Sequence, residues 1–178
     1  MFMSVIQKRR SIRQFSDTAV ESAKIDKLVE AALRAPSSRG LNPWEFVVVT
    51  DRKVLAKLGR AKEHGSAFMK NAAVGFVVCA NPGRSDVWIE DASIATIMIQ
   101  LAAASLDLGS CWIQIRARMH NDRRTAGDYI AEVLNLPPEL QVESMVAVGY
   151  PAEQKAPHAA AELQYEKVHR ESYGKAYK

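Results

Sequence analysis

DVWIEDASIATIMIQLAAASLDL, residues 86–108, is the stretch that decides the fold of this 178-residue chain. Small and apolar residues occupy nearly every face of the helix that it predicts, and a helix that is apolar all round is buried all round. A chain of this length can hardly surround such a helix alone, so we predict a homodimer with residues 86–108 near its interface. Glu90 and Asp91 enter the helix side by side, and we interpret them as first-turn carboxylates favoured by the helix dipole.

The segments around this helix predict a sheet flanked by further helices. Runs rich in β-branched residues predict four strands, at 45–50, 72–80, 111–116 and 142–150. Apolar spacing and capping residues predict four more helices: one capped by Ser4, one across 25–33, one opened by Asp51, and one through 129–134 that stops at Pro137. This order gives an α+β or α/β class. Without repeats or linkers, we treat 1–178 as a single domain, ending in a polar tail whose tyrosines suggest docking.

Composition excludes several classes of protein. Apolar residues make up 48% and charged residues 25% of the chain, which is typical of a soluble globular protein. The net charge of +4 does not by itself imply nucleic acid, and no apolar run is long enough for a membrane span. Cys79 and Cys111 lie in apolar runs without a CxxC motif, so we expect buried reduced thiols and a cytoplasmic protein.

The common catalytic and metal motifs are absent from the sequence. The four histidines are scattered without metal-ligand spacing, so no metal site is predicted. No GxSxG, P-loop or GxGxxG motif occurs either. If the protein is an enzyme, a cofactor rather than a side chain therefore supplies the reactive group.

KRRSIRQF, residues 8–15, gathers four cations around one hydroxyl. At the end of a short helix, Arg9 and Arg13 are one turn apart and face the same way. Two guanidinium groups and the Ser11 hydroxyl suit a phosphate. The alternative is a solvated basic helix end, which composition alone favours.

Two further segments combine backbone-shaping residues with polar groups. APSSRGLNPWEF, residues 35–46, offers the Ser37 and Ser38 hydroxyls and the donor and acceptor of Asn42, which can read an amide edge. LDLGSCWIQI, residues 106–115, ends the long helix at Gly109, and amides at such a junction can point at a ring nitrogen. An ordinary helix-stop loop and a glycine C-cap are the alternatives.

Taken in this order, these segments resemble the FMN-dependent nitroreductase family over essentially the whole chain. RRSIRQF is similar to the family's flavin-phosphate segment, and PSSRGLNPWEFVVV to its loop and strand. The long helix, the LDLGSCW turn and the closing VAVGYP complete the resemblance to a compact member. The resemblance implies an α+β fold, a three-layer α/β/α sandwich with a mixed, mainly antiparallel sheet, in an intertwined homodimer.

The resemblance also implies a set of cofactor-binding residues. The FMN phosphate is held by Arg9, Ser11 and Arg10, together with Lys155 or His158. Arg13 meets the N1/O2 edge of the flavin. In a cleft shared by two subunits, the ring is lined by Pro36, Ser37, Ser38 and Asn42, and the backbone amide of Gln114 meets N5. Gly40 and Asn42 stand where the family has Asn and Gln, so readout of the pyrimidine edge differs in detail.

The implied activity passes hydride from NADH or NADPH through FMN to nitroaromatic, quinone or similar small electron-poor acceptors, by a ping-pong mechanism. FMN carries the chemistry, so no side chain is assigned a catalytic role. A dehalogenase-like or flavin-fragmenting enzyme of the same fold is one alternative. A non-catalytic basic module that binds nucleotides is another, but the tyrosines and arginines are not interleaved as nucleic-acid binding requires. We expect neither a nucleic acid nor a membrane as partner.

Overall fold

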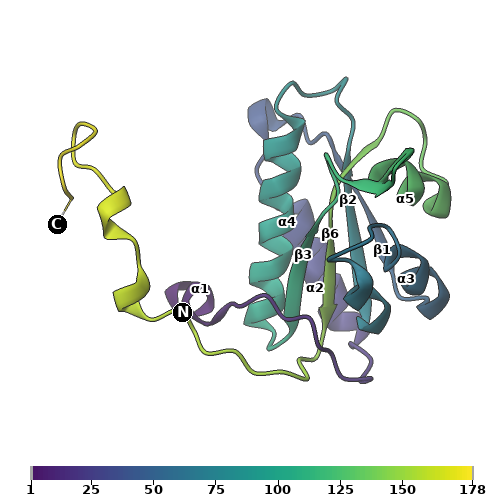
Figure 1. The fold of residues 1–178 in the computed structure, drawn as a ribbon, viewed down its shortest axis with the longest axis horizontal. Helices are drawn as coiled ribbons and strands as arrows, with labels where there is room; N and C mark the ends of the chain where they lie inside the picture. Colours follow the sequence, from purple (N-terminus) through teal and green to yellow (C-terminus); the bar gives the residue numbers. More distant parts are fainter. Residues whose placement is uncertain (1, 178) are drawn as a thin grey trace.

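A computed structural model describes residues 2–177 and contains a four-stranded antiparallel sheet (Figure 1). Its strand order is β1-β2-β6-β3, with bounds Trp44–Val49, Val74–Ala80, Gln141–Gly149 and Gly109–Gln114 respectively. The four predicted strands are therefore confirmed within one or two residues at each end. The central strands β2 and β6 are buried on both faces because helices cover both sides of the sheet.

Helices on the two faces complete three layers. On one face lie α2 (Ser22–Leu33) and α4 (Trp88–Ser105), whose Leu28 and Ile99 pack with Phe76 of the sheet. On the other lie α3 (Arg52–Leu58) and α5 (Ala126–Leu134), packed against the apolar side chains of β6. The predicted α/β/α sandwich is confirmed. The main sheet is antiparallel throughout, and its parallel element is a single bridge between Ser11 and Ser110.

Local signals set most helix ends. The Asp51 carboxylate accepts the N–H of Val54 at 2.9 Å and caps α3 as predicted. The predicted Ser4 cap is wrong, since Ser4 lies inside α1 (Phe2–Lys8). The predicted helix end at Gly109 is also wrong, because α4 ends at Ser105 and Gly109 begins β3. The short 3₁₀ turns η1 (Ser38–Gly40) and η2 (Ala67–Asn71), and the hairpin of β4 (Met119–Asn121) with β5 (Arg124–Thr125), were not expected.

One face of α4 stays at the surface of the single chain. Ala95 and Ile99 are fully buried, whereas Ile94 and Ile97 on another face are 37% and 36% exposed. Burial on all sides therefore does not arise within one chain. The homodimer remains a prediction, now with a defined apolar face that needs covering.

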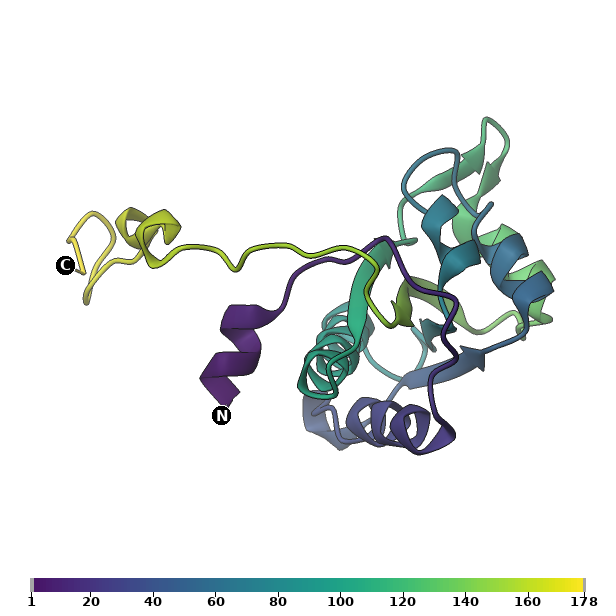
Figure 2. The same cartoon turned by 90° about the horizontal axis from the view of Figure 1, so that it is seen from below.

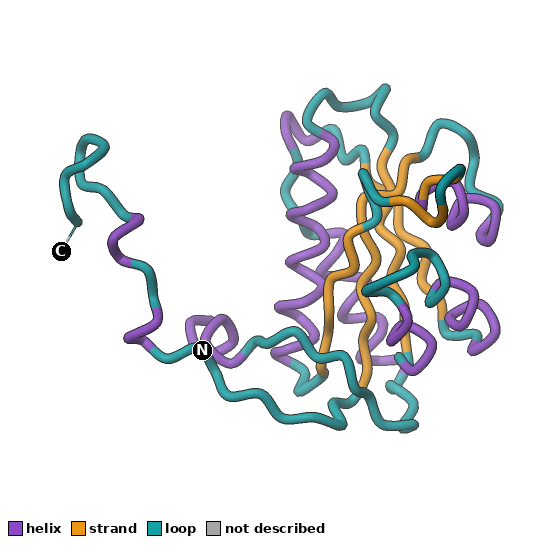
Figure 3. Tube along the Cα trace, viewed as in Figure 1, coloured by secondary structure: helices purple, strands orange, loops and turns teal. Residues whose placement is uncertain are grey.

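The two ends of the chain extend away from the sandwich. Residues after β6 run past α1 and continue beyond the body as a long arm (Figures 1 and 2). Figure 3 shows this arm as loop interrupted by the short turns η3 (Ala160–Glu162) and η4 (Tyr165–Lys167). Leu163, Val168 and Tyr173 in the arm are exposed, so its predicted docking remains a prediction. Within residues 2–177, no helix combines the length and apolar character needed to cross a bilayer.

Candidate cofactor site

The basic segment at residues 9–16 is extended rather than helical. The helix α1 stops at Lys8, and the N–H of Ile12 donates to the carbonyl of Ser110 at 3.0 Å. The predicted helical spacing of Arg9 and Arg13 is therefore wrong. The segment instead follows the open edge of β3, and it approaches so closely that a Cβ on Gly109 would lie 2.9 Å from Ile12. Extended backbone is what allows the Ile12 N–H to pair with β3 while its side chain packs against that glycine.

Extended backbone still brings the predicted groups together. Its period of two residues places Arg9, Ser11 and Arg13 on one side of the segment. The buried Cys111 thiol beneath them senses the same groups: burial raises its pKa, while the charges of Arg13, Lys155 and Arg9 and the Ser11 hydroxyl act to lower it. Cations from both ends of the chain therefore converge over the start of β3.

The chain that leaves β6 holds this segment in place. The Lys155 ammonium donates to the Ser11 carbonyl at 2.7 Å and lies 3.3 Å from the Glu153 carboxylate. That carboxylate accepts the N–H groups of Arg13 at 2.5 Å and Gln14 at 3.2 Å. These backbone N–H groups and Lys155 lower the pKa of Glu153. Sequence reasoning missed Glu153, which no motif marks.

Of the two residues predicted to complete the basic site, the structure places Lys155 there. His158 lies three residues farther along the arm, is largely exposed and sits 3.6 Å from Glu162. A cavity of about 330 Å³ opens beside Lys155. It is lined by Lys8, Arg9, Arg10, Ile12, Ala104, Asp107, Leu108, Gly109, Ser110, Pro151, Glu153 and Lys155. Its four cations outnumber its two carboxylates, which suits a dianionic phosphate.

The second predicted segment is a tight loop built around η1. The Ser37 hydroxyl accepts the N–H of Asn42 at 2.9 Å and donates to its side-chain oxygen at 2.6 Å. Asn42 and Gly40 have φ values of +46° and +65°, so glycine fits at the position where the family has Asn. Pro36 lies between the end of α2 and the start of this turn, where its fixed φ prevents the helix from continuing. The side-chain amide of Asn42 keeps its donor N–H₂ group for a ligand.

A buried carboxylate anchors this loop to α4. Asp91, 2% exposed, accepts the backbone N–H of Ser38 at 2.8 Å and the hydroxyl of Ser85 at 2.9 Å. Our interpretation of Asp91 as a carboxylate placed by the helix dipole therefore missed its contacts. Glu90, its neighbour, is exposed. The position of this carboxylate within an otherwise apolar helix is the sequence signal that could have indicated a buried contact.

Within one chain, the loop and the basic segment lie at opposite ends of α4 (Figure 1). Asp91 holds the loop at the first turn, whereas the cation-lined cavity reaches Ala104 near the last. Thirteen residues at about 1.5 Å rise each separate them by about 20 Å along the helix. One chain therefore does not bring the two predicted halves of the site together.

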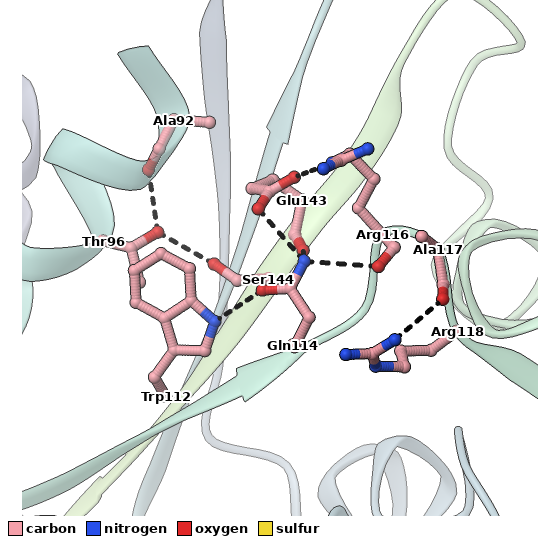
Figure 4. A network of polar contacts seen from close by, with 9 residues as sticks. All are labelled: Ala92, Thr96, Trp112, Gln114, Arg116, Ala117, Arg118, Glu143 and Ser144. Atoms are coloured by element: carbon pink, nitrogen blue, oxygen red, sulfur yellow. Dashed lines mark hydrogen bonds and ion pairs between the residues drawn. The ribbon is translucent and has the colours of Figure 1, made fainter. Parts of the chain in front are cut away.

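The backbone of Gln114 faces the open edge of β3. The Ser110 carbonyl points away from β6, because it accepts from Ile12, whereas the N–H of Ile115 points toward β6 and donates to Glu143. Backbone groups alternate in direction along an antiparallel edge strand, so those of Trp112 and Gln114 share the outward direction of Ser110. The Gln114 side chain is engaged separately, with Trp112 and Glu143 (Figure 4). The predicted amide is thus available to a ligand lying along the edge.

Comparison with known proteins agrees with this arrangement. The nitroreductase family model matches residues 6–65 and 60–150. The chain belongs to the nitroreductase family. A solved FMN-dependent nitroreductase from Clostridium difficile R20291 is 46% identical, with a TM-score of 0.95 over 96% of this chain and 99% of that one.

Two other relatives bear on the cofactor and the electron donor. A protein of Archaeoglobus fulgidus named "Putative NADH dehydrogenase/NAD(P)H nitroreductase" is 37% identical over 96% of this chain and 98% of its own length. A nitroreductase from Desulfovibrio desulfuricans, solved in complex with FMN, is 26% identical, with a TM-score of 0.75 over 95% of this chain and 98% of that one.

The residues present fit FMN. Arg9, Arg10 and Lys155 line a cavity that suits the phosphate, whereas Ser11 and Arg13 are not among its lining residues. The outward backbone groups of β3 offer donors along its open edge. Across the described part of the chain, no three His, Cys, Asp or Glu side chains gather closely enough to hold a metal ion.

Proposed function

We propose that this nitroreductase passes hydride from NADH or NADPH to nitroaromatic, quinone or similar electron-poor acceptors by a ping-pong mechanism. The observation that carries the proposal is the cation-lined cavity at the start of β3, the strand whose Gln114 backbone faces outward farther along the same edge. When bound, FMN accepts a hydride at N5 and returns two electrons to the acceptor. For a quinone the balance closes with one solvent proton, giving the quinol and NAD(P)⁺.

The chain's own residues bind and orient the cofactor. Arg9, Arg10 and Lys155 line the cavity and would hold the phosphate there, with the Lys155 ammonium fixed on the Ser11 carbonyl. The Ser11 hydroxyl does not line this cavity, so its phosphate contact rests on the resemblance to the family. Arg13 extends toward the ring, with its guanidinium carbon 5.8 Å from the Phe68 ring centroid and its N–H fixed by Glu153. A cation at the N1/O2 edge stabilises the negative charge of reduced flavin.

The outward N–H of Gln114 would donate to N5 of the bound cofactor. Donor and acceptor would then use the one ring face that β3 leaves open, in turn. This sharing is the physical basis of the ping-pong order. A reducing cytoplasm and a single domain over 1–178 remain predictions.

A second copy of the chain completes the site. The ring-lining loop with Pro36, Ser37, Ser38 and Asn42 lies about 20 Å from the basic segment of its own chain. Two α4 helices packed antiparallel through the Ile94 face bring the start of one helix beside the end of the other. The exposed apolar residues of the arm then have a second body to wrap around. This homodimer buries the α4 face that one chain leaves open.

One set of measurements tests the proposal. Purified protein should sediment as a dimer at micromolar concentration and take up one FMN per chain. Turnover with NADH and NADPH against quinones and nitroaromatics should give parallel double-reciprocal lines. A stable monomer would overturn the shared site, and converging lines would overturn the ping-pong order. Absence of flavin binding would overturn both and leave the non-catalytic basic module, whereas turnover confined to halogenated aromatics would favour the dehalogenase-like alternative.

A further inference from the structure

A buried carboxylate, Glu143, interrupts the central strand β6. Its side chain is 3% exposed, although it lies among the apolar residues of the sheet. The pairing of β2 with β6 joins Val78 to Ser144 and Cys79 to Val142, so the register skips Glu143. Glu143 is thus the extra residue of a β-bulge, a feature that re-aims a side chain and is common beside active sites.

The carboxylate and backbone of Glu143 hold the end of β3 (Figure 4). One carboxylate oxygen accepts the side-chain amide of Gln114 at 3.1 Å, and the other lies 3.0 Å from Nε of Arg116. The Glu143 carbonyl accepts the N–H groups of Ile115 at 3.2 Å and Arg116 at 3.0 Å. Trp112 continues the network by donating to the Gln114 side chain at 2.9 Å. The contacts converge on the residue whose backbone amide faces outward.

The charges of this pair differ in their exposure. Glu143 is buried, whereas the Arg116 side chain is 43% exposed. Solvent screens a half-exposed cation more than a buried anion, so the negative charge acts more strongly on groups beside β3. Burial of a charge is costly, and a network that keeps one here is better explained by the site than by stability.

We propose that the Glu143–Arg116 pair sets the reduction potential of the FMN bound at Gln114. The inference rests on the proposed function. Glu143 disfavours the extra negative charge of reduced flavin, and Arg116 offsets that effect. Glu143 is also a positioning residue, because its contact fixes the Gln114 side chain.

The experiment measures the two-electron potential by dye-equilibrated titration of the holoenzyme. The variants are Glu143→Gln, Arg116→Gln, Arg116→Lys and the double Gln variant. Glu139→Gln is the matched control, since it removes the same charge from an exposed residue beside β1, at the opposite edge of the sheet. We expect Glu143→Gln to strengthen binding of reduced FMN over oxidised FMN at least threefold. That change raises the potential by about 14 mV, at about 30 mV per tenfold change.

The remaining variants separate charge from structure. Arg116→Gln should lower the potential, Arg116→Lys should restore it, and the double variant should return it close to the wild-type value. Equal potentials for Glu143→Gln and Glu139→Gln would overturn the proposal, as would shifts of one sign in both single Gln variants. If Glu143→Gln fails to fold, Arg116→Gln and Arg116→Lys still test the proposal, because only the first removes the positive charge. Wild-type protein that binds no FMN would instead refute the proposed function.

Discussion

Replacing Asp91 by Ala tests whether this carboxylate holds the ring-lining loop. The change removes the acceptor for the Ser38 N–H at 2.8 Å and for the Ser85 hydroxyl at 2.9 Å. Ser85 is 3% exposed, so its hydroxyl would be left without this partner in a nearly dry site. The loop should loosen first, because its contact with the start of α4 depends on Asp91.

The magnitude follows from these two bonds. A hydrogen bond to a charged group contributes about 1.5–3 kcal/mol, so two contribute about 3–6 kcal/mol. Removing a buried charge returns part of its desolvation cost, and water can reach the half-buried Ser38 N–H. We therefore expect Asp91→Ala to lower the free energy of unfolding by about 2–4 kcal/mol. Asp91→Asn keeps one oxygen for Ser38 and should cost about half as much.

Urea denaturation of FMN-free protein, at one fixed protein concentration, measures the change. Asp86→Ala is the control: it breaks an exposed ion pair with Arg39 on the same loop and should cost less than about 1 kcal/mol. Asp91→Ala should also weaken FMN and riboflavin equally, because the loop lines the ring rather than the phosphate. A loss no greater than that of Asp86→Ala would refute the reasoning.

Three further predictions concern the basic segment. Arg9→Ala should weaken FMN by about 1.5–3 kcal/mol, roughly tenfold to a hundredfold, and leave riboflavin nearly unaffected; equal losses in fluorescence titrations would contradict a phosphate contact. Arg13→Gln should lower the two-electron potential by about 30 mV for each tenfold loss of reduced over oxidised FMN, and an unchanged potential with weaker FMN binding would move Arg13 to the phosphate. The N–H of Arg13 and the other donors lower the pKa of Glu153 from 4.5, so its stabilising effect is present above pH 4.5 and is lost as the pH falls through the lower folded pKa. Glu153→Gln should therefore flatten the loss of thermal stability with acid below about pH 4.5, and parallel melting profiles for the two proteins would exclude this role.

Local chemistry in the sequence was sufficient for the elements of the fold. Strands follow from β-branched runs, and α3 begins where Asp51 can cap it. The end of α5 is set by Asn135 at a φ of +52°, two residues before Pro137. These signals act within a few residues, so a reader of the sequence can find them without knowing the packing.

The positions of the site residues depended on contacts between distant segments. The sequence named Arg9, Ser11 and Arg13, but their common side arises from extended backbone, because β3 offered an open edge and a glycine to Ile12. The helical spacing predicted for these residues rests on local helix propensity alone. Pairing with the open edge of β3 replaces that helix by extended backbone.

The sequence by itself determined the family, which is carried by motifs of a few adjacent residues, and the same motifs predict the cofactor and the residues that would bind it. Tertiary structure decided that Asp91 anchors the loop, that Glu143 lies in a bulge, and that α4 separates the two halves of the site by about 20 Å. No periodicity marks these features, because each depends on which residues, dozens of positions apart, meet when the layers pack. The same separation is the physical reason to expect a second chain at the site.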